Sequence, residues 1–417
     1  MPKISQIIAR EILNSRGHPT IESSVLCDNG AYGTASVPSG SSTGQNECLE
    51  IRDEDERYLG MGVLKAVNNI VSMIAPKLKG IEVEDQTKID EAMINLDGYP
   101  DKSKLGANAI LAVSIACLKA AANSTHQPLF VYIRDKFEGP KSFSLPSPIL
   151  NIINGGKHGA GNLDFQEFHI IPSTRFSFTK SIQVGAEIYQ LMKRELMHRN
   201  AIHSVGDEGG FAPNLFTNSD ALELMQLVIK NSGYKLNVDV FMGLDIAASG
   251  FYKDGRYTIK DSPKALDTPS MINFYLTLLK EYPLFSLEDA LDEKDWNGWV
   301  KLRQSVGNNT MIVGDDLLTT SPKMMKKAIE TQACNAATIK PNQIGTITET
   351  VEVVKLAQKN NINTVFSHRS GETNDTFIAD LAVGLGANFA KFGALNRGER
   401  VAKYNRLLEI ESYLGKV

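Results

Sequence analysis

Six short apolar segments in the second half of the chain each run directly into ionisable residues. If these segments are parallel strands of one sheet, their carboxyl ends meet at one edge, which is where barrel enzymes assemble their sites. The spacing therefore predicts one converging site. The ionisable residues are, in chain order, Asp245, Glu288, Asp315, Lys340, His368 with Arg369, and Lys391.

A competing interpretation is that each of these residues caps the following helix. Asp is a favoured N-cap, so for a single Asp at a strand end this explanation has about even odds. Glu288 is a poor cap, and Lys340 and Lys391 cannot accept a hydrogen bond from a backbone N–H. Independent caps therefore do not explain the whole set.

The three carboxylates, Asp245, Glu288 and Asp315, offer oxygen ligands without thiolate or imidazole. Such a site suits a hard cation, Mg²⁺ before Mn²⁺ or Ca²⁺. A lysine beside a divalent cation is pushed towards its neutral form and can remove a proton, while a second lysine can stay charged and hold an anion. The alternative is that both lysines only form structural ion pairs with the carboxylates.

Three glycine-rich loops, 38–44, 154–161 and 206–210, could close over this site. Glycine lets a backbone approach a ligand closely, although tight turns have the same composition. His158 and Glu208 lie within two of these loops and are candidates for substrate contact. The segment 367–373 adds an arginine next to an expected helix N-terminus, which is a natural phosphate seat.

The elements that position these residues differ between the two parts of the chain. Residues 4–37 alternate short apolar runs with turn signals at 16–19 and 28–30, which predicts an antiparallel meander. Helical spacing follows at 63–74 and 85–96, and 107–122 predicts a buried helix that is apolar on most sides. Glycine and proline between 137 and 148 are typical of a linker.

Beyond the linker, about eight short apolar strands alternate with amphipathic helices, which matches a (β/α)₈ barrel. A doubly wound open sheet is the rival, but no GxGxxG follows the first strand. Strands are expected at 149–153, 168–171, 240–244, 284–287, 311–313, 336–339, 364–366 and 389–390. Helices are expected at 179–199, 219–232, 269–281, 322–331, 346–359 and 375–385.

Composition limits the class of protein. The 417 residues carry 44 Lys and Arg against 48 Asp and Glu, a net charge of −4, which disfavours nucleic acid and anionic membranes as partners. Four dispersed cysteines indicate thiols in a reducing compartment. No signal sequence and no apolar stretch of about 20 residues is expected, so the chain is predicted to be cytoplasmic without a membrane span.

These motifs together resemble the enolase family, and the resemblance runs from end to end. The matching segments are SRGHPT (15–20), VPSGSSTG (37–44), LGANAILAVSIA (105–116), NIINGGKHG (151–159), QEF (166–168), GDEGGFAPNL (206–215), LDIAAS (244–249), SLED (286–289), GDD (314–316), IKPNQIGT (339–346), SHRSGET (367–373) and AKYNRLLEIE (402–411).

The resemblance implies an α/β fold with an N-terminal α+β lid domain, residues 1–136, and an enolase-type TIM-like barrel, residues 137–417, whose first units depart from the plain (β/α)₈ pattern. It implies reversible Mg²⁺-dependent dehydration of 2-phosphoglycerate to phosphoenolpyruvate in glycolysis and gluconeogenesis. Sites of this superfamily use a Lys or His base with one or two Mg²⁺ ions. A homodimer, or an octamer of dimers, is also implied.

Roles for individual residues follow from the same resemblance. Lys340 is expected to be the base, and Glu208 the acid, supported by Glu167. Lys391 is expected to hold the substrate carboxylate together with the first Mg²⁺. Ligands of that ion are expected to be Asp245, Glu288 and Asp315, and Ser42 is expected to join a second Mg²⁺. The substrate-binding residues are expected to be His158, Gln166, Glu167, Glu288, Asp315, His368, Arg369, Ser370 and Lys391.

Several positions depart from the family pattern beside the expected site. His169 stands where Met is usual after QEF, Gly250 stands where Glu usually follows LDIAAS, and Phe392 replaces Thr after the second lysine. These departures leave open a catalytically weakened paralogue kept as a binding or surface protein. Enolases are known for secondary surface roles, including attachment to host plasminogen, which also leaves a surface or secreted pool open.

A third interpretation is an acid-sugar lyase or racemase on the same barrel. Those relatives lack the PSGSSTG and SHRSGET segments, which this chain carries. The remaining departures, at Asn14, Ser41, Asn396 and Gly398, fall on no expected catalytic or metal position. An active enolase is therefore the leading hypothesis.

Overall fold

A computed structural model describes residues 1–41, 43–159 and 161–415. The chain begins with a three-stranded antiparallel sheet, β1 (Ile4–Leu13), β2 (Pro19–Cys27) and β3 (Tyr32–Ser36). Asn14 Oδ1 accepts hydrogen bonds from two backbone N–H groups of the first turn, and Gly30 gives the second turn its left-handed conformation (φ 86°). The predicted meander is confirmed.

Helix α4 (Ala107–Ser124) packs against this sheet. By length and composition alone this helix could cross a membrane, but 83% of it is buried inside the protein, as in the core helix of a globular protein. The sheet approaches this helix closely at Gly33 of β3, where a Cβ would lie 2.3 Å from the Ala116 carbonyl oxygen. The predicted buried helix is confirmed.

The other helices of this part are α1 (Leu64–Asn69), α2 (Ala75–Leu78), α3 (Gln86–Asp97) and α5 (Leu129–Lys136). The single helix expected at 63–74 is wrong in detail, because a π-helical turn, Ile70–Ile74, separates α1 from α2. Pro76 follows that turn and has no N–H to donate to the carbonyl four residues earlier, which explains the interrupted ladder.

Eight strands then form a closed barrel, in the order β10-β11-β12-β13-β4-β5-β6-β9. All neighbouring pairs are parallel except those of β5, which runs antiparallel to β4 and β6. This is the modified opening that the resemblance implied, and the open-sheet alternative is wrong. The strands are β4 (Ser147–Asn154), β5 (Glu167–Pro172), β6 (Val240–Asp245), β9 (Leu284–Glu288), β10 (Met311–Gly314), β11 (Ala336–Ile339), β12 (Asn363–Ser367) and β13 (Phe389–Lys391).

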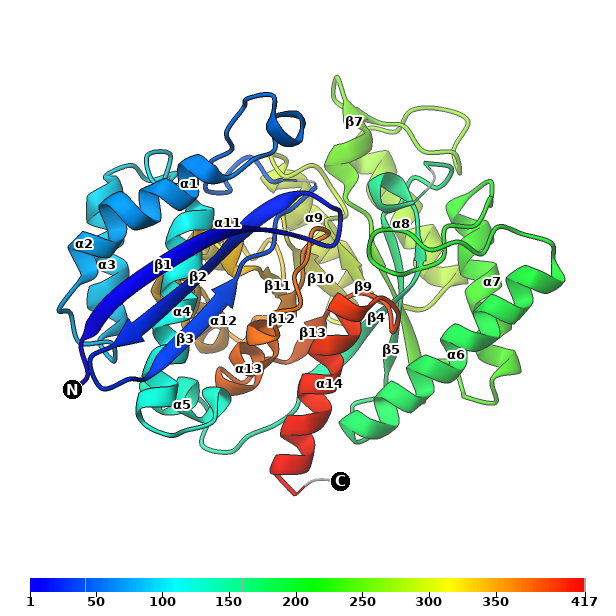
Figure 1. The fold of residues 1–417 in the computed structure, drawn as a ribbon. Coiled ribbons are helices and arrows are strands. Elements are labelled where there is room, and N and C mark those ends of the chain that lie inside the picture. Colours follow the sequence, from blue (N-terminus) through cyan, green and yellow to red (C-terminus); the bar gives the residue numbers. More distant parts are fainter. Residues whose placement is uncertain (42, 160, 416–417) are drawn as a thin grey trace.

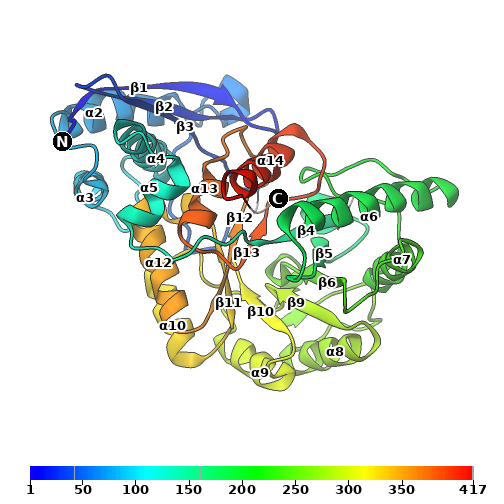
Figure 2. The same ribbon diagram turned by 90° about the horizontal axis from the view of Figure 1, so that it is seen from below.

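Helices surround the barrel, and the N-terminal sheet lies to one side of it, beyond α4 (Figures 1 and 2). A small hairpin, β7 (Tyr252–Lys253) and β8 (Arg256–Tyr257), follows β6. The helices are α6 (Phe178–His198), α7 (Asn218–Asn231), α8 (Thr268–Glu281), α9 (Trp296–Val306), α10 (Pro322–Thr331), α11 (Pro341–Ile344), α12 (Ile347–Lys359), α13 (Phe377–Gly384) and α14 (Gly398–Tyr413).

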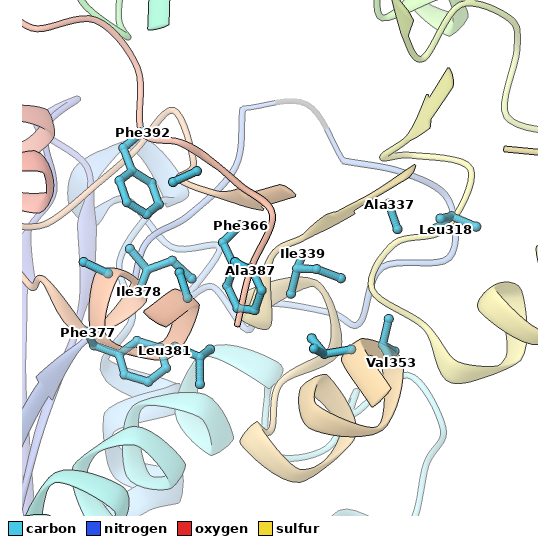
Figure 3. Packing of buried hydrophobic residues seen from close by; sticks show 14 of the residues in the cluster. Leu318, Ala337, Ile339, Val353, Phe366, Phe377, Ile378, Leu381, Ala387 and Phe392 are labelled. Atoms are coloured by element: carbon cyan, nitrogen blue, oxygen red, sulfur yellow. The ribbon is translucent and has the colours of Figure 1, made fainter. Parts of the chain in front are cut away.

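Side chains of successive strand residues face opposite sides of the barrel wall. On β12, Val365 belongs to a small apolar cluster shared with other strands, whereas Phe366 belongs to the large core that includes the helices. Figure 3 shows Phe366 and Ile339 packed near Ile378 and Leu381. Both faces of the wall are therefore anchored, which fixes the strand ends where the ionisable residues lie.

Candidate active site

Strand register places three carboxylates side by side at one end of the barrel. Glu167 is paired with Asp245 across β5 and β6, and Asp245 is paired with Glu288 across β6 and β9. Because β5 runs in the opposite direction, its first residue reaches the end where its neighbours finish. All three side chains are buried.

Lys391 lies among these carboxylates. Its Nζ is 2.8 Å from Glu288 Oε2, 3.0 Å from Asp245 Oδ2 and 3.6 Å from Glu167 Oε2. Burial acts to lower the pKa of Lys391, but the negative charges of Asp245 and Glu167 outweigh it and hold that pKa well above its ordinary value. Lys391 is thus a fixed positive charge at the centre of the site.

Lys340 forms a close ion pair with Asp315, whose other oxygen accepts a 3.0 Å hydrogen bond from Gln343. Burial acts to lower the pKa of Lys340, and the Asp315 carboxylate reverses this and raises it. Among the described residues, none of the ionisable residues predicted at the strand ends caps a helix with its side chain. Lys340 precedes α11 without such a bond. The N-cap interpretation is therefore wrong.

A second group of buried residues surrounds Glu208. Its Oε2 lies 3.4 Å from His158 Nδ1 and 3.2 Å from His368 Nε2, and His158 Nδ1 also lies 3.2 Å from Glu167 Oε1. Burial acts to raise the pKa of Glu208, but the two imidazoles hold it well below its usual range. Burial acts to lower the pKa of His158, which Glu208 and Glu167 instead raise to about 10.

Arg400, which the sequence analysis did not single out, binds the second ring nitrogen of His368. Its Nη1 donates to His368 Nδ1 at 2.6 Å, so His368 Nε2 must carry the proton that faces Glu208. Burial lowers the pKa of His368, and Arg400 adds to this against the opposing charge of Glu208. Arg400 comes from α14, and no spacing in the sequence relates it to strand ends.

The predicted phosphate seat lies beside the loop of the N-terminal domain. Ser39 and Gly371 exchange two backbone hydrogen bonds of 2.9 Å, and Ser370 Oγ contacts Ser41 Oγ at 2.8 Å. Arg369 pairs with Glu47 at 3.0 Å, another residue that the sequence analysis missed. Residues 39–41 of this loop are therefore docked over the barrel end.

One pocket collects most of the predicted site residues. The space in and above it, part of which is open to solvent, is about 270 Å³. Glu288 and Asp315 do not line it, but contact it through Lys391 and Lys340, and Ser42 lies outside the described residues. The lining residues are Ser41, His158, Gln166, Glu167, Glu208, Asp245, Lys340, Ser367, His368, Arg369, Ser370 and Lys391.

The buried carboxylates fit a hard divalent cation by donor chemistry, since they offer only oxygen. Within the described part of the chain, two groups have ligand atoms all within 4.8 Å of one another, His158 with Glu167 and Glu208, and Asp289 with Asp315 and Asp316. The predicted set of Asp245, Glu288 and Asp315 is not among them. Ammonium groups of Lys391 and Lys340 contact these three carboxylates instead.

The class of protein follows from the fold and the site together. A closed eight-stranded barrel whose ionisable residues gather at one end of the strands, beneath a loop of another domain, is the arrangement of a barrel enzyme.

Comparison with known families then gives the membership. Residues 4–133 match the family described as enolase, N-terminal domain, and residues 142–417 match enolase, C-terminal TIM barrel domain. The chain belongs to the enolase family. Membership indicates a lyase of the enolase superfamily.

Proposed function

We propose that the protein is a phosphopyruvate hydratase, which dehydrates 2-phosphoglycerate to phosphoenolpyruvate with Mg²⁺ in glycolysis and its reversal. The observation that carries the proposal is the pairing, in one buried pocket, of a lysine base candidate, Lys340, with a carboxyl acid candidate, Glu208. The phosphate seat at Arg369 and Ser370 supports a phosphorylated substrate.

The carboxylates of Asp245, Glu288 and Asp315 would hold the Mg²⁺. When bound, Mg²⁺ supplies positive charge next to the substrate carboxylate, whose negative charge grows as the C2 proton leaves. Lys391 adds a fixed ammonium charge at the same place.

Proton removal falls to Lys340. Its Nζ must be neutral to accept the C2 proton, and in the free protein the Asp315 carboxylate keeps it charged. An Asp315 that holds the cation would no longer favour the charged lysine, and the loss of this partner would lower the pKa of Lys340 in the buried site.

Glu208 donates a proton to the leaving hydroxyl at C3, so that water departs. The anionic substrate adds negative charge and raises the pKa of Glu208, which favours its protonated form. His158 positions this acid, because its Nδ1 lies 3.4 Å from Glu208 Oε2. Its charge lowers the pKa of Glu208, so the negative charge of the substrate must outweigh it for Glu208 to be protonated.

Hydrogen exchange separates the two roles. In deuterated water with Mg²⁺ and 2-phosphoglycerate, we expect Lys340→Ala to abolish both C2 proton exchange and phosphoenolpyruvate formation. We expect Glu208→Gln to keep exchange at C2 while product formation falls about 10²-fold or more, as for loss of a general acid. Nuclear magnetic resonance of the substrate reads both.

Lys326→Ala is the matched control, because Lys326 is exposed on α10, away from the pocket, and pairs with the surface residue Glu352. Circular dichroism verifies that all variants fold. C2 proton exchange at the wild-type rate in Lys340→Ala would show that another residue is the base. Equal losses of exchange and product formation in Lys326→Ala would show that the effect is not specific to Lys340.

A further inference from the structure

His169, the residue that departs from the family pattern after QEF, contacts the carboxylate of Glu167 directly. Its Nε2 lies 2.7 Å from Glu167 Oε2, and only 1% of the residue is exposed. It follows Glu167 by two positions on β5, so both side chains face the same side of the strand. Glu167 Oε1 in turn lies 3.2 Å from His158 Nδ1.

The direction of this hydrogen bond follows from the charge of Glu167. Glu167 has two cationic or donor neighbours, with Oε1 3.2 Å from His158 Nδ1 and Oε2 3.6 Å from the Lys391 ammonium group, and these neighbours favour its ionised form. An ionised carboxylate only accepts hydrogen bonds. His169 Nε2 therefore carries a proton and donates a hydrogen bond to Glu167.

We propose that His169 is a positioning residue for the acid of the reaction, holding Glu167 Oε2 so that Oε1 stays with His158 beside Glu208. The inference rests on the proposed function for the identity of the acid. His169 itself lines no part of the pocket, so it acts through Glu167 rather than on the substrate.

The geometry indicates the consequence of losing this donor. Glu167 Oε2 also lies 3.6 Å from Lys391 Nζ. Without His169, the carboxylate is free to turn towards that ammonium group, and the turn draws Oε1 away from His158. Glu208, the proposed acid, then loses its orientation, while the phosphate seat at Arg369 and Ser370 is unchanged.

The test compares His169→Met, which cannot donate, with His169→Gln, whose amide nitrogen can replace Nε2–H. In the Mg²⁺-loaded protein with 2-phosphoglycerate, we expect His169→Met to lower kcat about tenfold and to leave KM within about twofold. We expect His169→Gln to recover kcat to within about threefold of wild type.

His198→Met controls for the substitution itself, because His198 is exposed at the end of α6. Thermal unfolding measures any structural loss in the same variants. The proposal is overturned if His169→Met keeps the wild-type kcat, or if His169→Gln is as slow as His169→Met at equal stability.

A second readout does not depend on turnover. Nitrogen-15 resonance of labelled histidines, with the His169 signals identified by their loss in His169→Gln, reports which ring nitrogen is protonated. We expect a protonated Nε2 whose signal shifts in Glu167→Gln. An unprotonated Nε2 would contradict the proposal even if the enzyme converts 2-phosphoglycerate, and a protonated one would support the contact even if it does not.

Discussion

At the scale of residues, the site gathers side chains from the ends of barrel strands and from elements outside the barrel. Asp245, Glu288 and Lys391 follow apolar runs, and any parallel barrel brings such positions together. Arg400 and Glu47 could not be found this way, because each reaches the site from an element outside the barrel strands. Only packing of the whole chain places them there.

The charge state of Glu288 gives a prediction at this scale. Burial, with the nearby charges of Asp245 and Asp315, raises the pKa of Glu288 to about 8 against the opposing effect of Lys391. At about pH 7 this carboxyl is therefore mostly protonated in the metal-free protein. Because a carboxylate must be deprotonated to bind a cation, we expect Mg²⁺ binding to release up to about one proton from Glu288, besides any proton that Lys340 loses when Asp315 binds the cation.

Calorimetry in buffers of different ionisation enthalpy measures that release. We expect it to shrink at about pH 9, where Glu288 is already ionised. The affinity for Mg²⁺ should accordingly rise as pH increases towards about 8. Absence of proton release at about pH 7, or equal release at both pH values, would contradict the assignment of Glu288 as a ligand.

At the scale of elements, hydrophobic periodicity predicted all eight barrel strands, because each is a short buried run bounded by turns. It did not predict the π-helical turn at Ile70–Ile74, where the apolar spacing stays helical and only the hydrogen-bond ladder changes. The antiparallel direction of β5 also lies beyond periodicity, since direction depends on how the connections pack. That feature came from the family resemblance.

The contact between β3 and α4 gives a prediction about stability. A Cβ on Gly33 would lie 2.3 Å from both the Ala116 oxygen and the Ala120 nitrogen, which are backbone atoms and cannot move aside. We expect Gly33→Ala to lower the free energy of unfolding by about 2 kcal/mol or more. Urea unfolding measures the change.

Gly398→Ala is the matched control, because a Cβ there meets nothing within 4 Å and its backbone is not left-handed. We expect its effect to stay within about 0.5 kcal/mol, or to be stabilising at the start of α14. If Gly33→Ala lowers the free energy of unfolding no more than Gly398→Ala does, the close approach of sheet and helix does not determine the stability of the N-terminal domain.

At the scale of the whole molecule, the site depends on both parts of the chain. The barrel supplies the carboxylates and lysines, while the N-terminal domain supplies Ser39, Ser41 and Glu47 over the phosphate seat. Helices α3 and α4 of that domain pack on α12 of the barrel, which keeps the loop in register with the strand ends. The predicted homodimer or octamer stays a prediction.

The arrangement of the whole site also bears on the choice between an active enzyme and a weakened paralogue. Gly250 lies in a pocket beside Gln166 with open space around it, and Phe392 is buried, so neither departure blocks the pocket around Lys340 and Glu208. The described residues keep the expected base, acid and phosphate contacts in one place. We therefore expect turnover.

The most direct measurement is the rise in ultraviolet absorbance that accompanies phosphoenolpyruvate formation when the purified protein meets 2-phosphoglycerate and Mg²⁺. The proposed function predicts a steady rise that a chelator abolishes and that returns when excess Mg²⁺ is added. A flat trace from folded, Mg²⁺-loaded protein would contradict it and would assign this member of the enolase family another task.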